Sequence, residues 1–87
     1  MSLQLEPEIS FQAFIQLAAE ELLTETTQLE YETKFRNLTT WSSLNALLLI
    51  SRINETTGVF ISSFDLASLN TLGDIYELIL AKVNGTK

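Results

Sequence analysis

Apolar residues recur at helical spacing in three separate stretches of the chain, and polar residues fill most positions between them. The first stretch has its apolar positions at Phe11, Ile15, Ala18 and Leu22. Such spacing places the side chains on one face of an amphipathic helix. Pro7 suits the first turn, because its missing N–H has no helical partner there. The stretch therefore predicts a helix over about residues 7–23, and the threonines that follow favour leaving it.

The second stretch lies in the middle of the chain and is the most apolar. Its spacing predicts an apolar side formed by Leu44, Leu47, Ile50 and Ile53. Gly58 can adopt the left-handed conformation that ends a helix. The pattern therefore predicts a helix over about residues 43–57.

The third stretch predicts the last helix, over about residues 71–83. Its apolar positions are Leu72, Ile75, Ile79 and Val83. Thr71, followed three residues later by Asp74, resembles a capping box at its start. Asp65 favours the start of a short helical segment over about residues 63–68. The apolar triplet before that segment is too short to build a sheet.

The connection between the first two predicted helices, residues 25–40, is long for so small a chain, and long loops are usually functional or disordered. Apolar residues spaced through and just after it favour order: Leu29, Tyr31, Phe35, Leu38 and Trp41. Trp41 suits either an anchor in the core or a platform that stacks on a ligand, and the first reading is the commoner use of such a residue. We expect these side chains to hold the loop across the ends of the helices.

Together these elements predict an all-α bundle of three longer helices and one short helix around a common interior. The chain has 87 residues, which suffice for one domain with one small core. We therefore expect residues 1–87 to form a single domain.

Composition excludes several classes of function. The chain has no Cys and no His, so it lacks an imidazole base, a thiol nucleophile and a thiolate metal site, and we expect no enzymatic activity. A net charge of −6 with only five basic residues argues against nucleic-acid binding. Seven glutamates lie among the first 32 residues, where they form either a solvated face or, less commonly, a metal cluster.

Two adjacent serines, Ser42 and Ser43, lie at the start of the predicted middle helix. A helix N-terminus has unpaired N–H groups and the positive end of the helix dipole, so a phosphate attached there is stabilised by the backbone. Taken alone, a serine before an apolar run is more often a cap that only satisfies those N–H groups. The serine pair by itself leaves both interpretations open.

The order of elements from about residue 35 to 79 resembles an acyl carrier protein. A long loop ends in Ser42-Ser43-Leu44, similar to the family's Asp-Ser-Leu motif, and a partner-recognition helix follows. The segment Gly58-Val59-Phe60-Ile61-Ser62 is similar to the family's turn in which an apolar pair closes the core, and Asn70-Thr71-Leu72-Gly73-Asp74-Ile75 looks like the start of its last helix. The resemblance implies a four-helix acyl-carrier-like bundle with 4'-phosphopantetheine attached covalently to Ser43.

The chain departs from the family pattern at two places. The usual Asp before the modified serine is Ser42, which removes one anionic contact for a modifying enzyme. The recognition helix, typically acidic, has only Glu55 as an acid. The resemblance assigns partner contacts to Ser42, Leu44, Asn45, Leu48, Arg52 and Glu55. We expect Leu48 to point outward as an apolar anchor, although it could instead pack inside against the loop.

The resemblance implies a carrier that holds an acyl or aminoacyl group as a thioester and presents it to separate enzymes. Its partners would be a phosphopantetheinyl transferase and the enzymes that load and transfer the group, in a lipid, polyketide or surface-glycan pathway. The alternative is an interaction module with the carrier fold that is never modified, which Ser42 in place of Asp favours. No apolar run approaches the ~20 residues of a membrane span, and we expect a cytoplasmic monomer.

Overall fold

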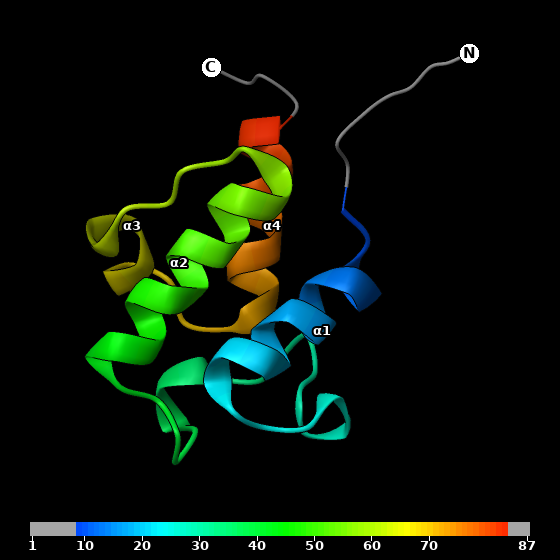
Figure 1. Cartoon of the computed structure of the whole chain (residues 1–87), viewed down its shortest axis with the longest axis vertical. Coiled ribbons are helices and arrows are strands. Elements are labelled where there is room, and N and C mark those ends of the chain that lie inside the picture. The colour runs from blue at the N-terminus through cyan, green and yellow to red at the C-terminus, as the bar shows by residue number, and fades with distance from the viewer. Residues whose placement is uncertain (1–8, 84–87) are drawn as a thin grey trace.

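The computed structural model describes residues 9–83 of the chain, and these residues form a helical bundle (Figure 1). The elements in chain order are α1 (Phe11–Leu22), the 3-10 turns η1 (Thr26–Gln28) and η2 (Phe35–Asn37), α2 (Ser43–Thr57), α3 (Ser63–Ala67) and α4 (Leu72–Val83). Within the described part, the only β pairing is an isolated bridge between Lys34 and Thr71. The predicted fold class, an all-α bundle of three longer helices and one short one, is confirmed.

Helix α1 begins later than the sequence pattern predicted. Ser10 has an extended backbone, and its Oγ accepts a hydrogen bond from the N–H of Ala13 at 3.1 Å. Ser10 is thus the N-cap, so the helix begins at Phe11, while Pro7 lies outside the described residues. The prediction of a start near residue 7 was wrong because the serine cap outweighs proline's suitability for a first turn. At the other end, Leu23 adopts a left-handed conformation with φ of 57°, which ends α1 at Leu22, one residue before the predicted end.

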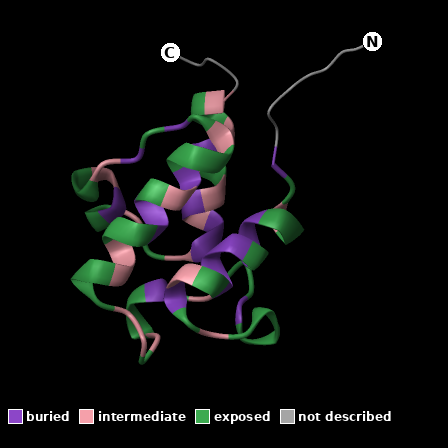
Figure 2. Cartoon of the chain, viewed as in Figure 1, coloured by how far each residue is buried: buried purple, intermediate pink, exposed green. Residues whose placement is uncertain are grey.

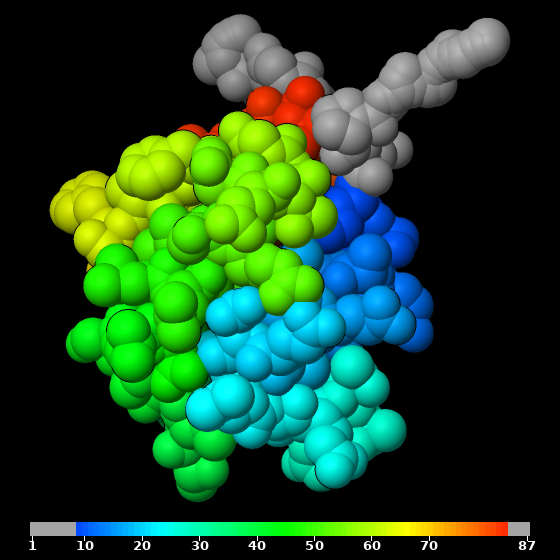
Figure 3. Space-filling view, viewed as in Figure 1, coloured from blue at the N-terminus to red at the C-terminus, as the bar shows by residue number. Residues whose placement is uncertain are grey.

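The core lies where the inner faces of α1, α2 and α4 meet (Figure 2). Nine of its large side chains are almost completely buried: Phe14, Leu22, Phe35, Leu49, Ile53, Ile61, Leu72, Ile75 and Ile79. The buried positions of α1 and α4 follow the predicted spacing, apart from Phe11 and Val83, which are only half-buried. In the space-filling view, the side chains of α1 and α2 lie directly against each other (Figure 3).

Helix α2 buries two of its four predicted core positions, Ile50 and Ile53, but not the other two. Leu44 and Leu47 are 65% and 57% exposed, whereas Leu49, Ile50 and Ile53 are buried. Residues 47–50 are consecutive apolar side chains that surround the helix, so spacing alone could not choose its rotation. The rotation follows from the contacts that α2 makes with α1, described below, and Gly58 ends the helix in the left-handed conformation, as predicted.

The long first loop is ordered and is joined to the start of α4. The N–H of Leu72 donates to the carbonyl of Thr33 at 2.9 Å, and the N–H of Gly73 donates to the carbonyl of Tyr31 at 2.8 Å. These bonds satisfy N–H groups in the first turn of α4 that have no helical acceptor. Phe35 is completely buried, and the half-buried Trp41 ring lies 4.9 Å from it, centroid to centroid. The prediction of Trp41 as a core anchor is confirmed.

Serine and threonine caps start the two remaining helices. At α3, Ser62 and Asp65 form a reciprocal capping box, so Asp65 starts the helix as predicted. At α4, the N–H of Asp74 donates to Thr71 Oγ1 and the N–H of Thr71 donates to Asp74 Oδ2, which confirms the predicted capping box. The segment between α2 and α3 has no regular secondary structure; Val59 and Ile61 are buried in it and Phe60 is exposed.

Candidate functional site

The two serines at the start of α2 have different structural roles. Ser42 is the N-cap: its Oγ accepts a hydrogen bond from the N–H of Asn45 at 3.2 Å and lies 2.6 Å from Asn45 Oδ1, to which it donates. Ser43 is the first residue of the helix and is exposed. Its hydroxyl forms no hydrogen bond within residues 9–83. The capping role therefore falls on Ser42, and the hydroxyl of Ser43 is available for chemistry.

The backbone around Ser43 favours an attached anion. Ser43 and Leu44 are the first two residues of the helix, where backbone N–H groups have no intrahelical acceptor. A helix of 15 residues adds the positive end of its dipole. Its first turn has no acidic residue that would compete with an attached phosphate for these N–H groups. A phosphodiester on Ser43 Oγ would lie beside these groups without displacing any existing hydrogen bond.

A surface groove of about 390 Å³ begins beside Ser43. Its walls are Ser43, Ala46, Leu47 and Ile50 from α2, Ser63, Leu66 and Ala67 from α3, and Arg36 and Trp41 from the first loop. Most of these side chains are apolar, so the groove suits an apolar or amide-containing chain better than a charged one. Ser43 is exposed at the start of a helix and lines a groove, so it is suited to carry a flexible group attached through a phosphate.

Arg36 is a wall of this groove and also binds the chain at and after α3. Its guanidinium donates to the carbonyl oxygens of Leu66 and Leu69, at the end of α3, and to Asn70 Oδ1 at 3.1 Å. It also lies 4.8 Å from the centroid of the Phe35 ring. Arg36 thereby joins the first loop to the segment between α3 and α4. The sequence contained no signal for this role, because the acceptors lie 30 or more positions from Arg36 and meet it only in the folded chain.

The side chains expected to contact partners divide into two groups. Asn45 Nδ2 donates to the carbonyl of Glu21 at 2.7 Å, and Arg52 forms ion pairs with Glu20 at 2.6 Å and Glu21 at 2.7 Å. The hydrogen bonds that the Arg52 guanidinium donates to Glu20 and then to Glu21 raise the pKa of Arg52 above its ordinary value. Together with the capping role of Ser42, these contacts show that this group supports the bundle itself.

The second group faces solvent. Leu44 is 65% and Leu48 43% exposed, and Glu55 is exposed one turn before the end of α2. The outward direction predicted for Leu48 is confirmed. Leu47, which the sequence pattern placed in the core, is exposed beside them. The predicted rotation of the helix placed Leu44 and Leu47 in the core, but both are surface residues.

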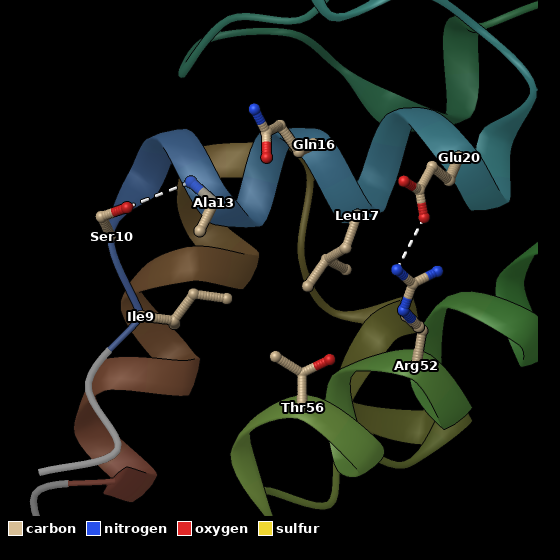
Figure 4. A pocket seen from close by; sticks show the side chains of 8 residues that line it. All are labelled: Ile9, Ser10, Ala13, Gln16, Leu17, Glu20, Arg52 and Thr56. Atoms are coloured by element: carbon tan, nitrogen blue, oxygen red, sulfur yellow. Dashed lines mark hydrogen bonds and ion pairs between the residues drawn. The ribbon is translucent and has the colours of Figure 1, made fainter.

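A second groove, of about 550 Å³, lies between α1 and the later part of α2 (Figure 4). It is lined by Ile9, Ser10, Ala13, Gln16, Leu17, Glu20, Arg52 and Thr56. Although it is larger, its charged residues are paired with each other and its serine is the cap of α1. Among the described residues, no group of three or more His, Cys, Asp or Glu side chains could hold a metal ion. The groove beside Ser43 is therefore the better candidate.

Within residues 9–83, no helix is both long enough and apolar enough to cross a membrane. Comparison with curated proteins and comparison with solved structures each found no match. The model of one protein family, described as the phosphopantetheine attachment site, matches residues 12–79. The match includes α1, the first loop, both serines, α2, α3 and most of α4. Because it covers well over half of the 87 residues, the chain belongs to the family of phosphopantetheine-binding carrier domains, in which 4'-phosphopantetheine is attached covalently to a serine.

Proposed function

We propose that Ser43 is the serine that receives 4'-phosphopantetheine, and that residues 1–87 form one carrier domain. The single observation that supports this assignment is the difference between the two serines of the motif. Ser42 already accepts a hydrogen bond from the N–H of Asn45, whereas Ser43 is exposed at the first position of α2. The hydroxyl of Ser43 can thus be modified without uncapping the helix.

The proposed modification replaces a phosphoanhydride bond by a phosphate ester. The hydroxyl oxygen of Ser43 bonds to the phosphorus that bears pantetheine in coenzyme A, the pyrophosphate bond breaks, adenosine 3',5'-bisphosphate leaves and the hydroxyl proton is released. The attached arm then supplies a terminal thiol, which carries an acyl or aminoacyl group as a thioester. The chain itself positions the arm: the start of α2 stabilises the phosphate, and the groove offers an apolar wall beside it.

We further propose that the chain carries its cargo between separate enzymes and does not itself catalyse a reaction. Members of this family interact with modifying and biosynthetic enzymes. The absence of His and Cys from the sequence supports a carrier role. A monomer in the cytoplasm, and a lipid, polyketide or surface-glycan pathway, stay expectations from the sequence. The partner contacts assigned to Leu44, Leu48 and Glu55 are supported by the exposure of all three.

The assignment is tested by incubating the protein with coenzyme A and a broad-specificity phosphopantetheinyl transferase and measuring the intact mass. We expect wild type and Ser42→Ala to gain one phosphopantetheine group and Ser43→Ala to gain none. Loss of modification in Ser42→Ala alone, with the helix intact, would move the site to Ser42. If wild type is modified neither by this enzyme nor by a transferase of its own cell, the protein is an unmodified module with the carrier fold.

A further inference from the structure

The two arginines of the chain differ in how their charges are paired. Arg52 forms ion pairs with Glu20 at 2.6 Å and with Glu21 at 2.7 Å. Arg36 forms no ion pair within residues 9–83, although the chain has 11 acidic residues and a net charge of −6. Its hydrogen-bond acceptors, described above, are two carbonyl oxygens and one side-chain amide oxygen, which are all neutral. The described part of the chain therefore leaves the positive charge of Arg36 without an anionic partner.

The same contacts hold the guanidinium of Arg36 in one place. It lies 4.8 Å from the centroid of the Phe35 ring, and Phe35 is 0% exposed. Nη1 donates one hydrogen bond and Nη2 donates two. A guanidinium has further N–H donors, and in Arg36 the Nε–H and the second N–H of Nη1 have no acceptor within residues 9–83. Arg36 is therefore a positioned cation with N–H groups left for a ligand.

Arg36 lies in the wall of the groove that begins beside Ser43. The other walls are mostly apolar, and Trp41, Leu47 and Leu66 are among them. A group that fills the groove removes water from the guanidinium, and a cation that loses water without gaining an anionic partner costs free energy. An anion on the same group offsets this cost, because opposite charges attract strongly in apolar surroundings. The groove therefore favours an occupant that is apolar along its length and carries an anionic group.

The proposed arm brings two candidate anions to this surface. The first is its phosphodiester, which would be attached to Ser43 and lie beside the N–H groups at the start of α2. The rest of pantetheine, up to the thiol, contains amides and a hydroxyl group and has no charge. An anion at the far end of the arm therefore belongs to the cargo. A carboxylate is the anion that an acyl group can carry while its other carboxyl group forms the thioester.

We propose that Arg36 binds a carboxylate of the cargo, and that the groove thereby selects acyl groups with a second carboxyl group over neutral acyl groups. Aminoacyl groups are disfavoured as well, because the guanidinium repels their ammonium group. This inference rests on the proposed function. Hydrogen bonds from a guanidinium to a carboxylate are stronger than those between neutral groups. The N–H groups without an acceptor supply them, so binding leaves the bonds from Arg36 to Leu66 and Leu69 in place.

The test compares two cargoes on the same protein. A broad-specificity phosphopantetheinyl transferase loads Ser43 from glutaryl-coenzyme A or from pentanoyl-coenzyme A. The two acyl groups have equal chain length, and one ends in a carboxylate where the other ends in a methyl group. NMR of an isotope-labelled terminal carboxyl group follows the titration of the glutaryl carboxylate. Contact with a guanidinium favours the charged form, so we expect the titration midpoint to lie about 0.5–1 pH units lower in wild type than in Arg36→Met.

A second measurement needs no variant, and it decides the matter if circular dichroism shows that Arg36→Met does not fold. The nitrogen NMR resonance of Arg36 Nε is compared between the protein with an unloaded arm, with pentanoyl and with glutaryl. We expect the resonance to move when glutaryl is loaded and to stay in place when pentanoyl is loaded.

Lys34→Met is the matched control. It removes a positive charge from a nearby exposed position of the first loop that does not line the groove. The glutaryl titration midpoint should equal that of wild type. Arg36→Lys keeps the charge without the planar guanidinium and should give a midpoint between those of wild type and Arg36→Met. An equal change in Lys34→Met and Arg36→Met would show that the general field of the protein acts on the cargo, and would overturn the proposal.

The remaining outcomes separate this proposal from the carrier role. If the Arg36 resonance moves when the unloaded arm is attached and glutaryl adds nothing, the guanidinium binds the phosphodiester, and the selection of cargo is wrong. If no arm or cargo moves it, Arg36 only joins the first loop to the segment after α3, and the proposal is overturned. Both results leave the carrier role intact. Failure of wild type to accept an arm from any transferase refutes the proposed function itself.

Discussion

Gly73 lies where an added Cβ would collide with the ring of Tyr31. A Cβ at this position would lie 2.3 Å from Cε1 of the Tyr31 ring, which is held in place by a hydrogen bond to Glu77 at 2.7 Å. The same hydrogen bond, with some help from burial, raises the pKa of Tyr31 above its ordinary value. The glycine thus allows the first loop to cross the start of α4 at the point where their backbones pair.

We predict that Gly73→Ala lowers the free energy of unfolding by about 1–3 kcal/mol, because the methyl group forces the ring or the helix to move. Urea denaturation followed by circular dichroism measures the change. In the Tyr31→Ala background the same substitution should cost far less, since the clashing ring is gone. Equal costs in the two backgrounds would show that Gly73 is required for another reason.

At the scale of the element, α4 depends on the carboxylate of Asp74. This carboxylate accepts hydrogen bonds at 3.0 Å from the backbone N–H groups of Thr71 and Asn70, and these bonds hold its pKa below the ordinary value of 3.8. A depressed pKa in the folded state means that the ionised carboxylate stabilises the protein above the unfolded value, and that this contribution is lost as the pH falls through the folded pKa.

We therefore predict that Asp74→Asn weakens the protein by roughly 1 kcal/mol near neutral pH, in the range of an ordinary helix cap, and less as the pH falls below 4. The midpoint of thermal unfolding, measured at several pH values for both proteins, checks this. The two curves should converge at acid pH. Parallel curves would mean that the charge of Asp74 does not contribute.

At the scale of the whole molecule, the first loop and the helices share one core. Phe35 from the loop and Ile50 from α2 are 0% and 8% exposed. Removing most of either side chain leaves a cavity, and we predict a loss of about 2–5 kcal/mol for Phe35→Ala and for Ile50→Ala. Ser43→Ala should cost much less, because Ser42 is the cap.

Denaturant midpoints compare the three variants. If the loop were an independent addition, Phe35→Ala would leave the midpoint near that of wild type while Ile50→Ala would lower it. A single shared core predicts that both variants lose stability in one cooperative transition.

The sequence by itself determined the number and type of the helices, because local signals suffice for them. The apolar spacing of α1 and α4, Gly58 at the end of α2 and the paired caps Thr71 and Asp74 all act within a few residues of one another. The motif around Ser43 was likewise local, but only the order of elements from about residue 35 to 79 suggested the family, which the match over residues 12–79 confirms. Ser10, the cap at the start of α1, was also a local signal, but Pro7 favoured an earlier start of the helix.

Tertiary structure alone decided which side of α2 is buried and which residues surround Ser43. Residues 47–50 are all apolar and surround the helix, so it could have packed in several rotations. The contacts of Asn45 and Arg52 with α1 hold it in the observed rotation. That choice exposed Leu44 and Leu47 and brought Arg36 and α3 to the groove. The contacts of Asn45 and Arg52 with α1 join residues 24 or more positions apart in the chain, so no short stretch of sequence could reveal them.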